Sequence, residues 1–382
     1  MRIAYVINST EGGGAASPVP AVARVLAAQG ATVEVFALTR RDGRGIPAML
    51  ASGLQVHVRP GGEKDHLAAL AWLDASLAGW RPDIIWTSLT RATLLGQLVG
   101  LRRNVPVVSW QHAAFLKPAN RMLLRASQGL SQLWIGDSHS VTALTAERLR
   151  VPFERLACWP LFAADAAAPQ ARPWSPGEPV RIGMLGRLHP VKGHDVLIEA
   201  LVRLRAQGCC ALTPFEVRIA GDGAGREALA GASAMAGLDN VRLVGFSDSP
   251  REFLAGLHLY LQPSRSEGLC IAAHEAMQAG LPVIVSAVGE LPYTVRDGDT
   301  GLIVPPGDAD ALAHALAWML SHPDRLARMG AAARGRVLDR FGAAAFAKAG
   351  ADIVSRLPIR SANGLAAVPH QSRDHQTSGQ SA

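Results

Sequence analysis

Cysteines and aromatic residues are both scarce in this chain, and their scarcity excludes several classes of protein. The four cysteines are Cys158, Cys209, Cys210 and Cys270, and they form no Cys-x-x-Cys pair. No histidines have the spacing of metal ligands, so we expect neither a disulfide scaffold nor a metal site. Aromatic residues make up only 5% of the chain, which is few for stacking on nucleic-acid bases.

Long apolar runs are also missing. None approaches the roughly 20 residues of a membrane span, and the N-terminus lacks the features of a signal peptide, so we expect a cytoplasmic protein. Lys and Arg outnumber Asp and Glu by 38 to 31, which suits an anionic small ligand or peripheral contact with the acidic inner membrane face. No basic run is interleaved with aromatic residues, so no nucleic-acid partner is expected.

Short β-branched segments alternate with longer amphipathic segments along most of the chain. This alternation predicts an α/β fold with parallel sheets covered by helices on both faces. The predicted strands are residues 2–7, 32–38, 54–58, 83–87, 105–110, 133–136, 180–185, 215–220, 241–244, 257–262, 282–286 and 301–304. The predicted helices lie near 19–29, 64–79, 91–101, 117–130, 139–149, 195–207, 225–236, 251–256, 270–280, 309–320 and 324–338.

A Pro- and Ala-rich break divides the chain into two doubly wound units. We predict an N-terminal domain over 1–165, a linker over 166–179 and a C-terminal domain over 180–340. Residues 358–382 lack aromatics and are rich in polar residues, which predicts a disordered tail. Two such units facing each other place a ligand cleft between the loops at the carboxyl ends of their strands.

The first loop of the second unit carries two cations. Arg187 follows the predicted strand 180–185 and offers a planar fork of donors, and Lys192 adds a mobile charge five residues later. Asp195 is placed to cap the next helix, whose N-terminus attracts anions. The loop fits a diphosphate, although two exposed cations on an ordinary loop would have the same sequence.

Two glutamates, Glu267 and Glu275, lie in the segment that runs from the end of the strand 257–262 into a helix. The backbone N–H groups of residues 268–271 are expected to face an anion. On a continuous helix the two glutamates would be roughly 12 Å apart, so they would bind two ends of an extended ligand through its hydroxyl groups. A helix cap at Glu267 and a solvated Glu275 explain the spacing equally well.

This segment resembles the signature of the retaining glycosyltransferase family 4, which has the GT-B fold of two Rossmann-like domains. The pattern Pro-Ser-x-x-Glu-Gly, followed by Glu-Ala-Met-x-x-Gly-x-Pro-Val, extends here from Pro263 to Val283. The two glutamates are separated by seven residues, as in the family. Flanking pieces also match in order, including Gly186-Arg187, Lys192-Gly193, Gly221-Asp222-Gly223 and Gly298 to Asp308. The resemblance covers nearly all of 180–340 and is much weaker over the first 170 residues.

The resemblance implies an enzyme that uses a nucleoside-diphosphate sugar as its donor substrate and needs no cofactor. We expect it to be metal-independent, because no Asp-x-Asp lies in a suitable loop; Asp297-Gly298-Asp299 belongs to the Gly-rich turn before the strand 301–304. It implies that Arg187 and Lys192 neutralise the leaving diphosphate, that Glu267 lies near the transferred sugar and that Glu275 binds the ribose hydroxyls. The expected donor-binding residues between the glutamates are Gly268, Leu269, Cys270 and Ile271. A nucleophilic role for Cys270 is not expected, because the sequence shows no base for it.

Two features of the first half fit the same expectation. Gly13 and Gly14 follow the first strand, where the family has a similar glycine pair, and glycine lets a backbone approach a phosphate or sugar. A flexible turn is the alternative. His112 resembles the family's histidine that faces the donor sugar, and an ordinary partly buried histidine is the alternative. In GT-B enzymes the final helix returns to the N-terminal domain, a role that residues 341–357 could fill.

The sequence thus predicts a retaining glycosyltransferase of the hexosyltransferase type that serves cell-surface polysaccharide or glycolipid synthesis. Its acceptor would be a glycan, a lipid-linked molecule or a small molecule. A non-catalytic nucleotide-sugar-binding protein of the same fold is the main alternative. An NAD-dependent oxidoreductase is less favoured, because the segment from Gly12 to Ser17 lacks the third glycine of Gly-x-Gly-x-x-Gly.

Overall fold

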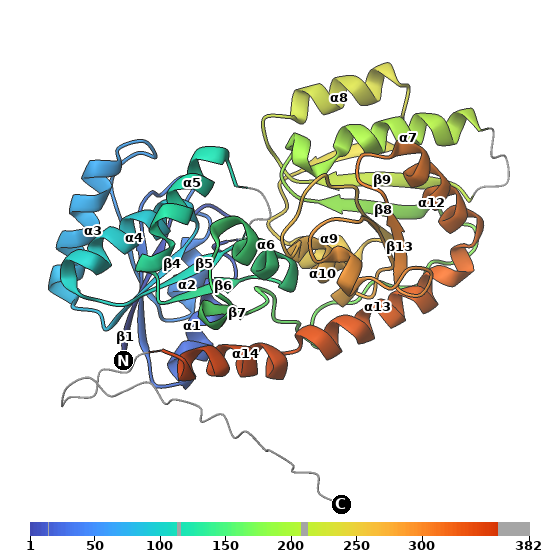
Figure 1. Cartoon of the computed structure of the whole chain (residues 1–382). Helices are drawn as coiled ribbons and strands as arrows, with labels where there is room; N and C mark the ends of the chain where they lie inside the picture. Colours follow the sequence, from blue (N-terminus) through green and yellow to red (C-terminus); the bar gives the residue numbers. More distant parts are fainter. Residues whose placement is uncertain (14, 113–115, 208–212, 358–382) are drawn as a thin grey trace, which may run out of the picture.

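The computed structural model describes residues 1–13, 15–112, 116–207 and 213–357. The chain folds into two parallel sheets, one in each half (Figure 1). The predicted tail over 358–382 lies outside the described residues.

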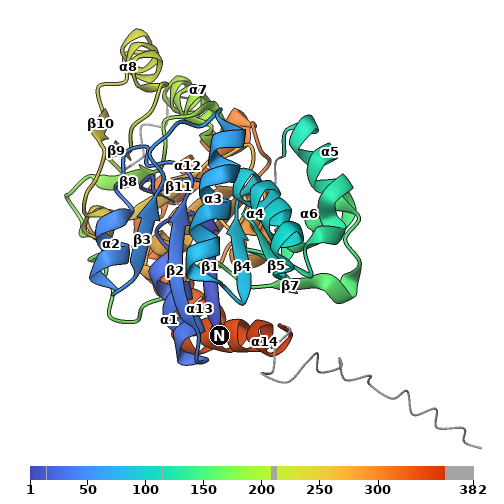
Figure 2. The ribbon, with the colours of Figure 1, turned by 90° about the vertical axis from the view of Figure 1, so that its left-hand side faces the viewer.

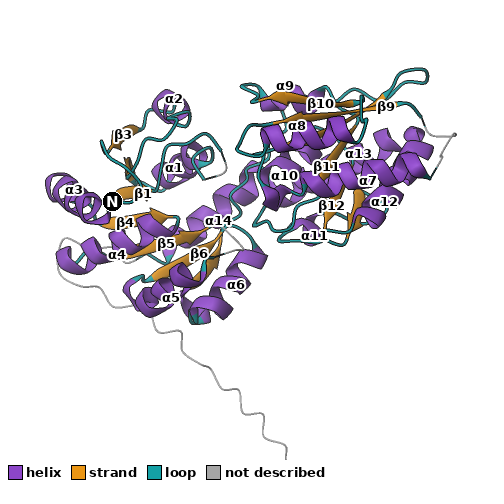
Figure 3. Ribbon diagram, turned by 90° about the horizontal axis from the view of Figure 1, so that it is seen from above, coloured by secondary structure: helices purple, strands orange, loops and turns teal. Residues whose placement is uncertain are grey.

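The first half is built on seven parallel strands in the order β3-β2-β1-β4-β5-β6-β7. Strands β4, β5 and β6 are buried at every residue, as expected for a parallel sheet covered on both faces. Figure 3 shows α1 and α2 on one face and α3 to α6 on the other. The strands are β1 Arg2–Ile7, β2 Thr32–Ala37, β3 Gln55–Val58, β4 Ile84–Ser88, β5 Val107–Gln111, β6 Leu133–Gly136 and β7 Leu156–Cys158, and the helices are α1 Val19–Ala28, α2 Ile46–Ala51, α3 His66–Trp80, α4 Thr90–Arg103, α5 Pro118–Ser127 and α6 His139–Leu149.

The second half contains six parallel strands in the order β10-β9-β8-β11-β12-β13. The strands are β8 Val180–Leu185, β9 Phe215–Ala220, β10 Val241–Gly245, β11 Leu259–Gln262, β12 Val283–Ser286 and β13 Gly301–Val304. The helices are α7 His194–Ala206, α8 Arg226–Met235, α9 Pro250–Ala255, α10 Ile271–Gln278, α11 Leu291–Thr294, α12 Ala309–Ser321, α13 Leu326–Phe341 and α14 Ala343–Ser355. In each sheet the direction of the strand order reverses once, between β1 and β4 in the first and between β8 and β11 in the second. Ligands of such sheets bind at this reversal, beside the carboxyl ends of the strands.

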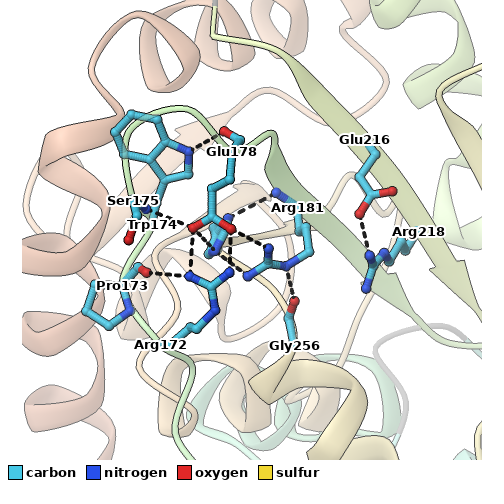
Figure 4. A network of polar contacts seen from close by, with 10 residues as sticks. Arg172, Pro173, Trp174, Ser175, Glu178, Arg181, Glu216, Arg218 and Gly256 are labelled. Atoms are coloured by element: carbon cyan, nitrogen blue, oxygen red, sulfur yellow. Dashed lines mark hydrogen bonds and ion pairs between the residues drawn. The ribbon is translucent and has the colours of Figure 1, made fainter.

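The linker is fixed to the second sheet by one carboxylate, that of Glu178 (Figure 4). Arg172 pairs with it, Arg181 of β8 donates to it at 2.9 Å, and the backbone N–H of Ser175 donates at 2.8 Å. The indole N–H of Trp174 donates to the Glu178 carbonyl at 2.9 Å. Beneath this network, a cavity of about 470 Å³ lies between the linker and α13. These contacts hold the linker against β8.

The last described helix, α14, crosses from the second half to the first (Figure 1). It packs against α1, and the ring of Phe346 lies 5.2 Å from that of Trp159. At the start of the crossing, the Ala164 N–H donates to the Phe341 carbonyl at 2.7 Å, and Ala164 forms an isolated β-bridge with Gly342. The two passages of the chain between its halves therefore run side by side.

The predicted α/β architecture is confirmed, and the differences from prediction concern short elements. Strand β7 has three residues, and α2 and α11 have six and four. All three are too short to show a full hydrophobic period, although the equally short α9 lies where a helix near 251–256 is predicted.

Candidate functional site

Two loops of the second half meet beside the carboxyl ends of β8 and β11. A Cβ atom at Gly193 would lie 2.0 Å from the carbonyl oxygen of Pro263, and Gly193 has φ +69°. Only glycine meets both conditions, so this residue lets the loops touch. Arg265 then donates to both carboxylate oxygens of Asp195 at 2.7 Å. The prediction that Asp195 caps α7 is wrong, because Gly193 is the N-cap and Asp195 ties the loops together.

Glu267 is held by three donors, all of which bind its Oε1 atom. The Lys192 ammonium lies 2.8 Å away, the Ser264 hydroxyl 2.6 Å and the Gln262 amide 3.0 Å. Gln262 is itself fixed by the buried Tyr260 hydroxyl, which donates to it at 2.7 Å. The core of the sheet thus orients the carboxylate, and the structure brings Lys192 and Glu267 together.

Arg187 and Lys192 differ in their surroundings. Arg187 is exposed, and its guanidinium forms no hydrogen bond or ion pair with any residue that the structure describes. The pKa of Lys192 lies above its ordinary value: burial lowers it, but the negative charge of Glu267 and the hydrogen bond to that carboxylate outweigh burial. Burial raises the pKa of the Cys270 thiol, which stays protonated and carries no charge. We therefore attribute the net rise in the Lys192 pKa to Glu267.

The segment between the two glutamates is not a continuous helix, because residues 268–270 form a loop before α10. Cys270 has φ +64°, and α10 begins only at Ile271. The separation calculated for a continuous helix therefore does not apply to Glu267 and Glu275, because Glu267 lies on the loop before α10. The N–H groups of Gly268, Leu269 and Cys270 donate to no other residue in the described ranges. Leu269 and Cys270 have buried side chains.

Glu275 lies on α10. Within the described part of the chain, its carboxyl group forms no hydrogen bond or ion pair. Burial raises the pKa of Glu275 to about 7, and the charge of Arg251 on α9 opposes this only weakly. A carboxyl group in this state is half ionised near neutral pH, and it can bind a hydroxyl group as either donor or acceptor.

His112 and Asp137 bring the first half to the same place. The Nε2 atom of His112 lies 2.7 Å from the Ser88 hydroxyl, and Nδ1 lies 3.9 Å from Oδ2 of Asp137. Burial lowers the pKa of His112 to about 3, so its imidazole is neutral near pH 7. Burial also raises the pKa of Asp137 well above its usual range. The Nδ1 atom of His112 and the Oδ1 atom of Asp137 are buried without a described partner.

Gly268 lies at one of the contacts between the two halves. A Cβ atom there would lie 2.6 Å from the His112 carbonyl oxygen and 3.3 Å from Oδ2 of Asp137. The Gly268 carbonyl accepts from the Glu290 N–H at 3.0 Å, and the buried Glu290 carboxylate accepts from the Ser140 N–H of α6 at 3.2 Å. The structure thus brings Gly268 and His112 together and adds Asp137 and Glu290, which the sequence did not predict. Asp137 directly follows β6, so its position at a strand end was the available signal.

Of the two predicted glycines, Gly13 lies in the loop after β1 with φ +139°. Its carbonyl accepts from the N–H groups of Ala16 and Ser17, and a Cβ atom at this position would have no other atom within 4 Å. Gly14 lies outside the described residues. In the described ranges no group of three His, Cys, Asp or Glu side chains could hold a metal ion. No helix among the described residues is long and apolar enough to cross a membrane.

Two family models match the chain, one in each half. The model described as Glycosyltransferase Family 4 matches residues 12–163, and the one described as Glycosyl transferases group 1 matches residues 170–336. The D-inositol 3-phosphate glycosyltransferase of Frankia alni is 30% identical over 375 residues, which cover 86% of this chain and 90% of that relative.

Other curated relatives match over a shorter part. The D-inositol 3-phosphate glycosyltransferase of Nocardia farcinica is 36% identical over 163 residues, or 41% of this chain and 36% of that protein. The GDP-mannose-dependent alpha-(1-6)-phosphatidylinositol monomannoside mannosyltransferase of Mycolicibacterium smegmatis is 33% identical over 188 residues. These residues cover 46% of this chain and 48% of that relative. The chain thus spans less than half the length of these two relatives.

Solved structures share the fold over nearly the whole chain. HepE of Anabaena, crystallised with UDP-glucose, has a TM-score of 0.79 at 20% identity and covers 94% of this chain and 100% of its own. The sucrose-phosphate synthase of Thermosynechococcus elongatus has a TM-score of 0.75 at 22% identity and covers 93% and 98%. Fold and sequence together define a GT-B glycosyltransferase. The chain belongs to glycosyltransferase family 4, as its sequence signature predicted.

Proposed function

We propose that this chain transfers a sugar from a nucleoside-diphosphate donor to an acceptor hydroxyl, with retention of the anomeric configuration and without a metal ion. The observation that carries the proposal is the Lys192–Glu267 pair, fixed at 2.8 Å beside loop N–H groups that have no hydrogen-bond partner among the described residues. A cation and free amides at one place suit a diphosphate, and an oriented carboxylate suits the hydroxyl groups of the attached sugar.

Each residue then has a distinct role. The unpaired Arg187 and the Lys192 ammonium bind the diphosphate and stabilise its negative charge as the glycosidic bond breaks. Glu267 binds the transferred sugar, and Glu275 binds the ribose hydroxyls. The backbone of residues 268–271 contacts the donor. Gly13 lets the loop after β1 approach the donor from the other half, as does Gly14 by sequence.

His112 is proposed to face the transferred sugar as a neutral imidazole. Its low pKa means that it would act near pH 7 as a hydrogen-bonding group and not as a cation. Its contact with Gly268 supports this role, because that contact places it beside the donor-binding loop. The N-terminal half would then bind the acceptor, and the C-terminal half the nucleotide sugar.

The proposed substrates follow the chemistry of the relatives. HepE was crystallised with UDP-glucose, and the mannosyltransferase of Mycolicibacterium smegmatis is named as GDP-mannose-dependent, which supports a nucleotide-sugar donor. The relatives' names also include an inositol phosphate, a phosphatidylinositol mannoside and the polysaccharide amylovoran. We therefore propose a glycan, lipid-linked or small polyol acceptor, and a cytoplasmic role in polysaccharide or glycolipid synthesis.

A panel of nucleotide sugars tests the proposal. The matching donor at a hundred times its Kd should stabilise the fold by about 2.7 kcal/mol, which a thermal shift detects. The same donor should release its nucleoside diphosphate on incubation, and the release should persist in the presence of EDTA. Stabilisation without release would instead identify a non-catalytic binding protein. Stabilisation by NAD, and by no nucleotide sugar, would refute the assignment.

A further inference from the structure

A long part of the first half contains no acidic residue. Between Asp83 and Asp137 there is neither Asp nor Glu, whereas six cations occur: Arg91, Arg102, Arg103, Lys117, Arg121 and Arg125. Three of the six have an acidic partner, because Arg91 pairs with Asp65, and Arg102 and Arg103 share Asp74 of α3. Lys117, Arg121 and Arg125 form no ion pair with any described residue, and all three are exposed.

The outward side of α5 is apolar. Met122 is 67% exposed and Leu123 49% exposed, whereas Leu124 is fully buried and anchors the helix to Trp134. At 100° per residue, Ala119 and Ala126 lie on the same outward side as Met122, and both are exposed. A surface helix of a globular protein normally turns its polar side to water. In α5 the basic residues lie only at the margin.

The neighbouring helix extends this surface. Helix α4 packs against α5, and Figure 2 shows both outside the seven-stranded sheet. On α4, Leu98 is 48% exposed and Leu101 is 66% exposed, three residues apart and therefore on one side of the helix. We call the set Leu98, Leu101, Ala119, Met122, Leu123 and Ala126, with Lys117, Arg121 and Arg125, the α4–α5 face. The acidic residues of the flanking helices are Asp74, already paired, and the exposed Glu147 of α6.

We propose that the α4–α5 face binds the surface of a bilayer that contains anionic lipids. Scattered single apolar residues on a surface are normal, but here four large ones occur on two adjacent helices without an acidic residue on either. Apolar side chains with Arg and Lys at their margin are the composition of helices that lie in a membrane interface. The unpaired cations complement anionic headgroups, which a neutral protein partner would not require.

The position of α5 connects this face with the candidate site. Helix α5 begins six residues after His112, whose carbonyl oxygen lies next to Gly268 at the contact between the halves. Membrane binding through α5 would therefore place the site close to the headgroups. This step rests on the proposed function, and it selects a lipid-anchored acceptor from the classes proposed above.

Vesicle flotation tests the proposal with the whole chain. The protein should float with vesicles of phosphatidylcholine and phosphatidylglycerol, and much less with phosphatidylcholine alone. High salt should weaken binding, because it screens the headgroup charge. The double variant Arg121→Gln/Arg125→Gln should lower the partition coefficient roughly 25-fold, about fivefold for each cation. Met122→Ser/Leu123→Ser should lower it roughly tenfold at any salt concentration.

Matched controls lie on other faces of the molecule. Met235→Ser removes an exposed apolar side chain of α8, and Arg328→Gln/Lys348→Gln removes two exposed cations of α13 and α14. Both controls should float like the parent chain. Equal flotation with both kinds of vesicle at all salt concentrations would overturn the proposal, as would an equal loss in the controls. Failure to float, combined with a dimer that Met122→Ser/Leu123→Ser dissociates, would overturn it in favour of self-association.

Donor turnover in solution separates this proposal from the proposed function. The Arg121→Gln/Arg125→Gln variant should release nucleoside diphosphate at the parent rate with a water-soluble acceptor or with water. With an acceptor presented in anionic vesicles, the same variant should turn over at least tenfold more slowly. Vesicle binding by a chain that turns over no donor would support the membrane surface and refute the function. Donor turnover by a chain that binds no vesicles would support the proposed function and refute the membrane surface.

Discussion

The carbonyl oxygen of His112 occupies the space that any side chain at Gly268 would need. A Cβ atom at Gly268 would approach it to 2.6 Å, and the carboxyl group of Asp137 to 3.3 Å. Gly268→Ala should therefore push the halves apart and misplace the donor-binding loop. We expect kcat/KM for donor turnover to fall roughly 100-fold, the loss typical of an error of about 1 Å in a site.

Gly231→Ala is the matched control for that substitution. Gly231 lies within α8, and a Cβ atom added there would have no neighbouring atom within 4 Å. Alanine should raise stability there by roughly 0.5–1 kcal/mol and leave turnover unchanged. Equal turnover in both variants would show that the contact between His112 and Gly268 does not position the site.

The ion pair between Lys192 and Glu267 should matter more for turnover than for donor binding. Lys192→Ala removes a cation that stabilises the leaving diphosphate, so kcat should fall roughly 100- to 1000-fold, with a smaller change in KM. Lys192→Arg should restore little, because the guanidinium fork cannot take the place of a point charge next to Oε1. Lys348→Ala, at an exposed lysine of α14, should have no effect. Steady-state kinetics with the donor identified by thermal shift would distinguish these outcomes.

The raised pKa of Glu275, about 7, predicts pH-dependent nucleotide binding. If the carboxylate accepts hydrogen bonds from ribose hydroxyls, the affinity for the nucleoside diphosphate should rise as pH increases through about 7, where the group ionises in the free protein. Glu275→Gln should bind more weakly and lose this dependence. Calorimetric titration across that pH range measures both effects. A parallel pH profile in the two proteins would contradict the role of Glu275.

Asp137 should destabilise the fold at higher pH. Its pKa in the folded chain is raised well above the ordinary value, mainly by burial. Between the ordinary and the raised pKa, the unfolded chain loses a proton that the folded chain keeps, so stability falls as pH rises. Asp137→Asn keeps the shape of the protonated group and does not titrate. The variant's Tm should therefore rise relative to that of the parent chain as pH increases above the ordinary pKa of an aspartate. A difference in Tm between the two proteins that does not change with pH would show that the pKa of Asp137 is not raised in the folded chain.

The sequence was sufficient to predict the sheets, because long apolar strands and amphipathic helices have periods that can be read locally. The family signature also identified Lys192 and Glu267 individually, but it assigned them to different parts of the donor. Their direct contact depends on how two loops fold against each other, which Gly193 permits. The left-handed backbone of Cys270 had no local signal, because a non-glycine residue adopts it only when its surroundings impose it.

Asp137 and Glu290 show a second limit. Each follows a strand of a different half, and each becomes part of the candidate site only because the folded halves bring it next to Gly268. Period and spacing describe neighbours along one element, so they do not report a contact between residues more than a hundred positions apart. A rule that collects every polar residue directly after a buried strand would have selected Asp137.

The two passages of the chain between its halves run side by side, joined where Ala164 meets Gly342. Two adjacent crossings that are bonded to each other should act as a hinge with one axis, and they restrict the halves more than a flexible linker would. We expect the halves to open and close the site by rotating about this crossing, because sliding along each other would break the bridge and the hydrogen bond from Ala164 to Phe341. Substrate entry and product release should therefore follow one rotation, whose axis lies beside Ala164 and Gly342.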